Sequence, residues 1–169
     1  MKFTAATYAD LEFRTPAEMR CVQDALLQKH IAYLAENSEF YRRMFAEHGI
    51  DPGSIRGGAD LSRLPLTAKA DLEHCPADFL CVPPSAIVDL CLTSGTTGKP
   101  VTLAQTRADL DRLGYNEEIS FRATGLDEND RVIIAAALDR CFMAGLAYFL
   151  GLERLGAAAI RVGSSSVPL

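Results

Sequence analysis

The segment LTSGTTGKPV, residues 92–101, concentrates hydrogen-bond donors between two apolar runs. Gly95 and Gly98 can adopt positive φ and have no Cβ, so the backbone can curl and bring its N–H groups close to a ligand. Consecutive inward amides favour an anion. Further donors come from the side chains of Ser94, Thr96, Thr97 and Lys99. A triphosphate is the commonest small ligand that needs so many donors, and the segment therefore predicts a phosphate-binding loop.

Two other interpretations of this segment have to be weighed. A plain hairpin turn between Leu92 and Val101 stays open, although such a turn does not need clustered hydroxyls beside a lysine. The phosphate loop GxxxxGK[ST] does not fit, because Thr93 stands where its first glycine belongs and Pro100 follows Lys99. A kinase-like or GTPase-like site is therefore disfavoured.

The elements around the loop alternate between strands and helices. We expect strands at 87–92, 101–105, 131–138 and 157–162, from their short apolar runs. Thr106, with Asp109 three residues later, can cap a helix that runs to about residue 124. A second helix, 142–155, is apolar on nearly every side and ends at Gly156. This order predicts an α/β fold with a largely parallel sheet that helices cover.

The N-terminal half has a different pattern, with helices and connections. Thr15 and Glu18 form a capping box around Pro16, so we expect a helix with an apolar stripe on one side. A second helix, 39–48, should end at Gly49, and Thr67 should cap a short helix through His74. We therefore divide the chain into a helical and connecting region, residues 1–84, and an α/β phosphate-loop subdomain, residues 85–169.

Composition excludes several classes of function. A net charge of -5 and a pI near 5.2 argue against nucleic-acid binding. The N-terminus lacks the apolar stretch of a secretory signal, and the longest apolar run, 141–152, is shorter than the ~18–20 residues that span a bilayer. We expect a cytoplasmic protein without membrane insertion. The five cysteines and three histidines show no metal-ligand spacing, so we predict reduced thiols, no metal site in the protein itself and no assigned catalytic side chain.

The loop sequence TSGTTGKP resembles the phosphate loop of the adenylate-forming superfamily, which includes acyl-CoA synthetases, luciferases and nonribosomal adenylation domains. The residues around the loop resemble one branch of this superfamily, the phenylacetate-CoA ligases, which also contains coenzyme F390 synthetase-like proteins. The stretches that carry this narrower resemblance are EFYRRMF, GIDPGSIRGGADLSRLPLTAKADL, TRADLD and ERLGAAAIRV. The resemblance covers residues 37–162. Members of this family are typically more than twice as long as this chain. The resemblance therefore implies a fragment, the N-terminal part of one incomplete large domain.

The resemblance implies two half-reactions. A carboxylate attacks the α-phosphate of ATP to give an acyl adenylate, and a thiol, usually coenzyme A, then displaces AMP. The loop would hold the β- and γ-phosphates together with Mg²⁺ and act by positioning and electrostatics. Carried over to this chain, its members are Thr93, Ser94, Gly95, Thr96, Thr97, Gly98 and Lys99. The implied partners are ATP, coenzyme A and a small carboxylic acid.

One departure from the family bears on the acid. After the third predicted strand this chain has Asp139, Arg140, Cys141 and Phe142 in place of a glycine- and aromatic-rich stretch. A charged pair at the C-terminal end of a parallel strand lies where α/β sheets bind ligands. Arg140 can pair with an acyl carboxylate, or it can form a surface ion pair with Asp139 or a neighbour. We predict Asp139, Arg140 and Phe142 as acid-binding residues, and an aryl acetate is a doubtful substrate.

Two alternative functions remain at this point. The chain can be a noncatalytic nucleotide-binding or interaction module that keeps only the loop. It can also belong to an adenylyltransferase of the F390 synthetase type, which transfers AMP itself. Whatever its function, a fragment that lacks its partner layers can expose one face of the apolar helix 142–155. We therefore expect the isolated chain to form a homo-oligomer. We also expect that the chain does not complete adenylation by itself.

Overall fold

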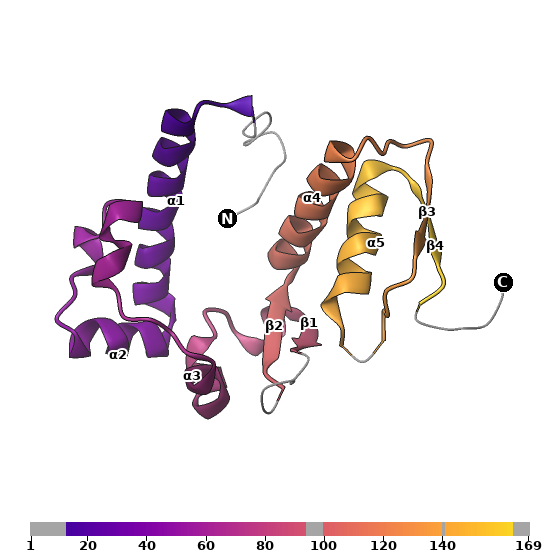
Figure 1. Cartoon of the computed structure of the whole chain (residues 1–169). Helices are drawn as coiled ribbons and strands as arrows, with labels where there is room; N and C mark the ends of the chain where they lie inside the picture. Colours follow the sequence, from indigo (N-terminus) through magenta and orange to yellow (C-terminus); the bar gives the residue numbers. More distant parts are fainter. Residues whose placement is uncertain (1–12, 94–99, 140, 164–169) are drawn as a thin grey trace. The chain divides into compact units, whose positions relative to one another are not determined.

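The computed structural model describes residues 13–93, 100–139 and 141–163. The described residues up to Pro83 form one compact unit, and those from Pro84 onward form another (Figure 1). Each unit has its own group of buried apolar side chains.

The first unit begins with two consecutive helices, α1 (Pro16–Asn37) and α2 (Glu39–Glu47). The predicted capping box of α1 is confirmed, because the Glu18 N–H donates to Thr15 Oγ1 (3.3 Å) and the Thr15 N–H donates to Glu18 Oε2 (2.9 Å). Ser38 follows α1 directly and is the N-cap of α2. The two helices pack around the buried residues Ile31, Met44, Phe45 and Ile55.

Short helices connect α2 to the end of the first unit. They are η3 (Pro52–Ser54), η4 (Gly58–Arg63), α3 (Lys69–His74) and η5 (Pro76–Phe79). The prediction that Thr67 caps the short helix is wrong, since the N-cap is Ala68, whose N–H donates to the carboxylate of Asp71 (2.7 Å). An acidic side chain in the first turn meets this amide without a hydroxyl at the cap. The Thr67 hydroxyl instead lies 3.3 Å from the Tyr41 hydroxyl.

The second unit contains two separate strand pairs. After η6 (Pro84–Ala86), β1 (Ile87–Leu92) and β2 (Thr102–Thr106) form an antiparallel hairpin, and β3 (Arg131–Ile134) pairs in parallel with β4 (Ala158–Arg161). The expected single, largely parallel sheet is therefore wrong for the described strands. Segment 93–101 is shorter than the dozen or so residues that a parallel connection needs, so β2 folds back on β1. The fold is mixed α/β, and β3 ends at Ile134 instead of residue 138.

Two helices pack tightly against each other in this unit, α4 (Arg107–Ala123) and α5 (Met143–Leu155). In Figure 1, α5 lies between α4 and the β3–β4 pair. The approach of the helices requires Gly151, because a Cβ there would lie 3.0 Å from a ring carbon of Phe121. A buried apolar cluster between α5 and β3 consists of Ile134 of β3 and Leu152 and Leu155 of α5. The predicted stop at Gly156 is confirmed by its left-handed φ of 87°.

Candidate nucleotide and acid site

The β1–β2 hairpin holds both ends of the predicted phosphate loop. Leu92 is the register partner of Thr102, and Thr93 meets Val101 one step further along. The Thr93 N–H donates to the Val101 carbonyl (3.0 Å), and the Val101 N–H donates to Thr93 Oγ1 (2.9 Å). The other predicted phosphate ligands lie outside the described residues: Ser94, Gly95, Thr96, Thr97, Gly98 and Lys99. The structure thus describes the base of the predicted loop, the bonded pair Thr93 and Val101, which we call the stem.

The bonds at the stem determine what Thr93 can offer to a ligand. Its main-chain N–H is used within the hairpin and is not among the amides that can line a phosphate site. Its hydroxyl oxygen accepts one bond, but a hydroxyl also carries a proton to donate.

The second group of predicted residues lies beside this stem. The Leu92 N–H donates to the carbonyl of Cys141 (3.0 Å), and the Phe142 N–H donates to the carbonyl of Asp139 (3.1 Å), which closes a turn. Asp139 and Phe142 are both exposed, whereas Arg140 lies outside the described residues. The structure therefore brings Asp139 and Phe142 to the end of the hairpin from which the loop departs. We call residues 139–142 the acid turn.

The acid turn has an unusual backbone. Cys141 has a φ of 57°, in the left-handed region that a residue with a Cβ rarely adopts, and Phe142 is the N-cap of α5 without a side-chain cap bond. Two residues into α5, a Cβ on Gly145 would collide with the carbonyl of Ala137. The turn is thus held between a close backbone contact and the hydrogen bond to Leu92. Nothing in the sequence pattern around Cys141 signals this conformation, since glycine or asparagine is its usual marker.

Gln105 lies on the inner side of the hairpin and was not predicted as a site residue. Its Nε2 donates to the sulfur atoms of Cys91 and Met143, each at 3.7 Å. Its Oε1 is buried without a hydrogen-bond partner in the described structure. Burial, and secondarily the charge of Asp89, raises the pKa of the Cys91 thiol, so Cys91 is neutral near pH 7. Gln105 therefore links β1 and β2 to the first residue of α5.

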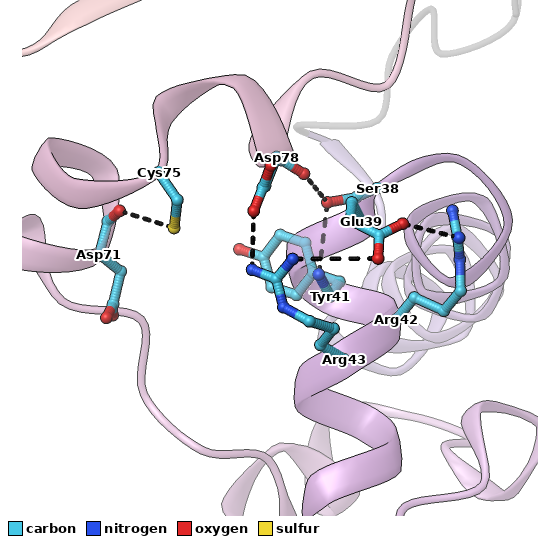
Figure 2. Close-up of polar contacts among 8 residues, drawn as sticks. All are labelled: Ser38, Glu39, Tyr41, Arg42, Arg43, Asp71, Cys75 and Asp78. Atoms are coloured by element: carbon cyan, nitrogen blue, oxygen red, sulfur yellow. Dashed lines mark hydrogen bonds and ion pairs between the residues drawn. The ribbon is translucent and has the colours of Figure 1, made fainter.

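A cluster of polar and charged side chains also lies in the first unit (Figure 2). The fully buried Ser38 hydroxyl donates to the Asp78 carbonyl (2.9 Å) and accepts from the Tyr41 N–H (3.3 Å). Arg43 forms ion pairs with Asp78 (2.7 Å) and Glu39 (3.9 Å), and the bond to Asp78 raises the pKa of the Arg43 guanidinium. These groups are paired with one another. The cluster joins α2 to η5 and is structural.

Across the described residues, no group of three or more His, Cys, Asp or Glu side chains is placed to hold a metal ion. Within the same ranges, no helix combines the length and apolar character needed to cross a membrane. All five cysteines are described, and each is a free thiol.

Comparison with known proteins identifies relatives over most of the chain. No protein-family model matches. The phenylacetate-coenzyme A ligase of Escherichia coli (strain K12) is 34% identical over 151 residues, which are 89% of this chain and 34% of that protein. The corresponding enzyme of Thermus thermophilus is 34% identical over 154 residues, again 34% of its length. The chain spans about a third of the length of these relatives.

A solved structure shows the same fold. A crystal structure of 2-hydroxyisobutyryl-CoA ligase in complex with 2-HIB-AMP and CoA superimposes with a TM-score of 0.82 at 31% sequence identity, covering 91% of this chain and 33% of that one. The mixed α/β architecture is thus that of part of an adenylate-forming CoA ligase. More narrowly, the chain is homologous to the phenylacetate-coenzyme A ligases, as the sequence resemblance predicted.

Proposed function

We propose that this chain is the phosphate-loop part of an AMP-forming acid–thiol ligase, which activates a carboxylic acid as acyl-AMP and transfers it to coenzyme A. The observation that supports this most directly is the hydrogen bond between Leu92 and Cys141. It places the acid turn beside the two ends of the loop, in a chain homologous to phenylacetate-coenzyme A ligases. A site that joins a carboxylate to a nucleotide phosphate needs both groups within bonding reach.

In this proposal the loop binds the triphosphate. Backbone amides at Gly95 and Gly98, the hydroxyls of Ser94, Thr96 and Thr97, and the Lys99 ammonium donate to the β- and γ-phosphate oxygens. Mg²⁺ arrives with the nucleotide and neutralises part of its charge. The donor chemistry of the segment fits this ligand, because its side chains are donors or cations and include no carboxylate. The loop thereby stabilises the charge on departing pyrophosphate.

The acid turn supplies the proposed acid contacts. Arg140 pairs with the carboxylate of the acid, while the exposed Phe142 ring at the start of α5 contacts its apolar part. Asp139 is the third residue of this proposed acid-binding set. The solved relative binds 2-HIB-AMP and CoA, which supports an acid adenylate and coenzyme A as the ligands of this class.

We propose further that these 169 residues do not form acyl-AMP alone, because they span only a third of the length of their relatives.

Nucleotide binding by the proposed phosphate loop is tested on the chain as it is, by calorimetric titration with MgATP. Lys99→Ala and Thr97→Ala should each weaken binding by about tenfold or more, since charge-assisted phosphate contacts are lost. Lys69→Ala, which removes a half-exposed lysine of α3 that pairs with Glu73, is the matched control and should bind like the unmodified chain. Equal affinity in all variants, or no uptake of MgATP, would contradict the proposal.

We also propose that the isolated chain associates with itself, through a different surface from the one the sequence suggested. The buried side of α5 includes Ala147, Leu152 and Leu155. Ile133 and Ile160 are register partners on the opposite face of the β3–β4 pair and are 62% and 39% exposed. Parallel strands are usually covered on both faces. Ile133→Lys should shift the chain to a monomer in size-exclusion chromatography, and a monomeric unmodified chain would refute self-association.

A further inference from the structure

The antiparallel ladder between β1 and β2 ends in an irregular way at Thr93. In a hydrogen-bonded antiparallel pair, each residue donates its N–H to the carbonyl of the other. Thr93 donates to the Val101 carbonyl (3.0 Å) as this pattern requires. The return bond goes elsewhere, because the Val101 N–H donates to the Thr93 side-chain hydroxyl (2.9 Å). The hydroxyl has taken the place of the Thr93 carbonyl.

The neighbouring residues agree with this interpretation. Leu92 and Thr102 form the next pair, and in a regular ladder the amides of such a pair point away from the partner strand. The Leu92 N–H does point away, since it donates to Cys141. After a register shift between Ile87 and Asp89, the ladder is therefore regular from Asp89 to Leu92, and the exchange of acceptors occurs one residue later.

Satisfying the Val101 amide matters because Val101 is only 4% exposed. A buried N–H without a partner is costly, and water has little access to replace the acceptor. The Thr93 hydroxyl provides this acceptor while freeing its own carbonyl from the ladder. The main-chain amides of Thr93 and Val101 are thus both bonded.

We propose that Thr93 is a positioning residue, whose hydroxyl ends the ladder by bonding the buried Val101 amide, and that nucleotide binding depends on this bond. This inference rests on the proposed function, since it assigns Thr93 a role in nucleotide binding that is exerted through Val101. A direct contact of Thr93 with phosphate is the competing explanation. The two differ in the nucleotide-free chain, where only the positioning role affects the Val101 amide.

The experiment compares Thr93→Val, which keeps the shape and removes the hydroxyl, with Thr93→Ser, which keeps the hydroxyl. Thr102→Val is the matched control, because it makes the same change at an exposed position of the next strand. Hydrogen exchange of the Val101 amide is measured by NMR without nucleotide, and MgATP affinity by calorimetry. Thr93→Val should speed Val101 exchange and weaken MgATP binding by about tenfold or more, whereas Thr93→Ser and Thr102→Val should stay within about threefold of the unmodified chain.

Each other outcome overturns a defined part of this inference. Weaker MgATP binding by Thr93→Val with unchanged Val101 exchange would mean that Thr93 contacts phosphate directly. Faster Val101 exchange with unchanged affinity would mean that the hydroxyl bond has no role in nucleotide binding. If the unmodified chain bound no MgATP, the proposed function would fail, and Val101 exchange would still decide whether the hydroxyl bond forms.

Discussion

The main-chain N–H of Leu92, the last residue of β1, donates to the carbonyl of Cys141 in the acid turn (3.0 Å). This bond joins two segments that are far apart in sequence at the end of the hairpin from which the predicted phosphate loop departs. The carbonyl can reach Leu92 because Cys141 adopts a left-handed backbone, with a φ of 57°. The geometry of the acid turn therefore depends on the conformational cost at one residue.

Substitution of Cys141 should reveal this cost. Cys141→Gly is expected to leave the free energy of unfolding unchanged or raise it by up to about 1 kcal/mol, because glycine adopts positive φ without steric penalty. Cys141→Val should lower it by about 1–2 kcal/mol, since a β-branched side chain is least compatible with this region. Urea denaturation measures both variants, and a valine variant as stable as the glycine variant would contradict the assignment.

Gly145 should not tolerate a larger residue, because the backbone of Ala137 leaves no room for a Cβ. An added Cβ would lie 2.7 Å from the carbonyl carbon of Ala137, and a backbone atom cannot move aside as a flexible side chain can. Gly145→Ala is expected to destabilise the chain by about 1–3 kcal/mol. Gly58→Ala is the control, because its nearest added contact, with an Asp24 carboxylate oxygen, is an ordinary 3.9 Å. Equal thermal unfolding midpoints for the two variants would show that the segment before the acid turn can shift.

Local signals in the sequence predicted most elements correctly. The capping boxes at Thr15 and Thr106 and the stop at Gly156 are short-range features, and the structure confirms all three. Strand pairing was predicted less well, because it depends on contacts between distant residues. Alternation of strands and helices suggested one parallel sheet, whereas β2 returns to β1 through a short connection.

The candidate site shows the same division. Composition and spacing pointed to residues 93–99, and a departure from the family resemblance pointed to residues 139–142. The bond between Leu92 and Cys141 brings the described ends of these segments together. No pattern of residues indicates this bond, because it is formed by main-chain atoms. Gln105 is not indicated either, since its contacts with Cys91 and Met143 join β2 to two other elements, β1 and α5.

Ser38 should be important for the stability of the first unit. It is fully buried, caps α2 and donates to the carbonyl of Asp78 (2.9 Å), as Figure 2 shows. Ser38→Ala removes the cap and leaves that carbonyl without its donor, so the free energy of unfolding should fall by about 1–3 kcal/mol. Ser120→Ala, an exposed serine in α4, should change it by less than about 0.5 kcal/mol. A Ser38 variant no less stable than the Ser120 variant would refute this role.

Acid should weaken one loop of the first unit through Asp60. Its carboxylate accepts the Arg56 N–H (2.8 Å), and this bond, aided by Arg63, lowers the pKa of Asp60. A lowered pKa in the folded chain contributes stability above the unfolded value of about 3.9, and that stability is lost as the pH falls through the folded pKa. The thermal midpoint of Asp60→Asn should therefore lie below that of the unmodified chain at pH 6 and converge with it below pH 4. A constant difference across this range would contradict the pKa shift.

Cysteine reactivity should follow the burial that the structure assigns. Cys141 is exposed, whereas Cys91 is buried beside the Leu103 carbonyl, and burial raises the pKa of the Cys91 thiol. Because the thiolate is the reactive species, iodoacetamide at pH 7.5 should label Cys141 at least about tenfold faster than Cys91. Peptide mass spectrometry measures both rates, with the exposed Cys21 of α1 as the reference in the other unit. In denaturant the rates should converge, because the difference arises from the fold, and equal rates in the native chain would place Cys91 at the surface.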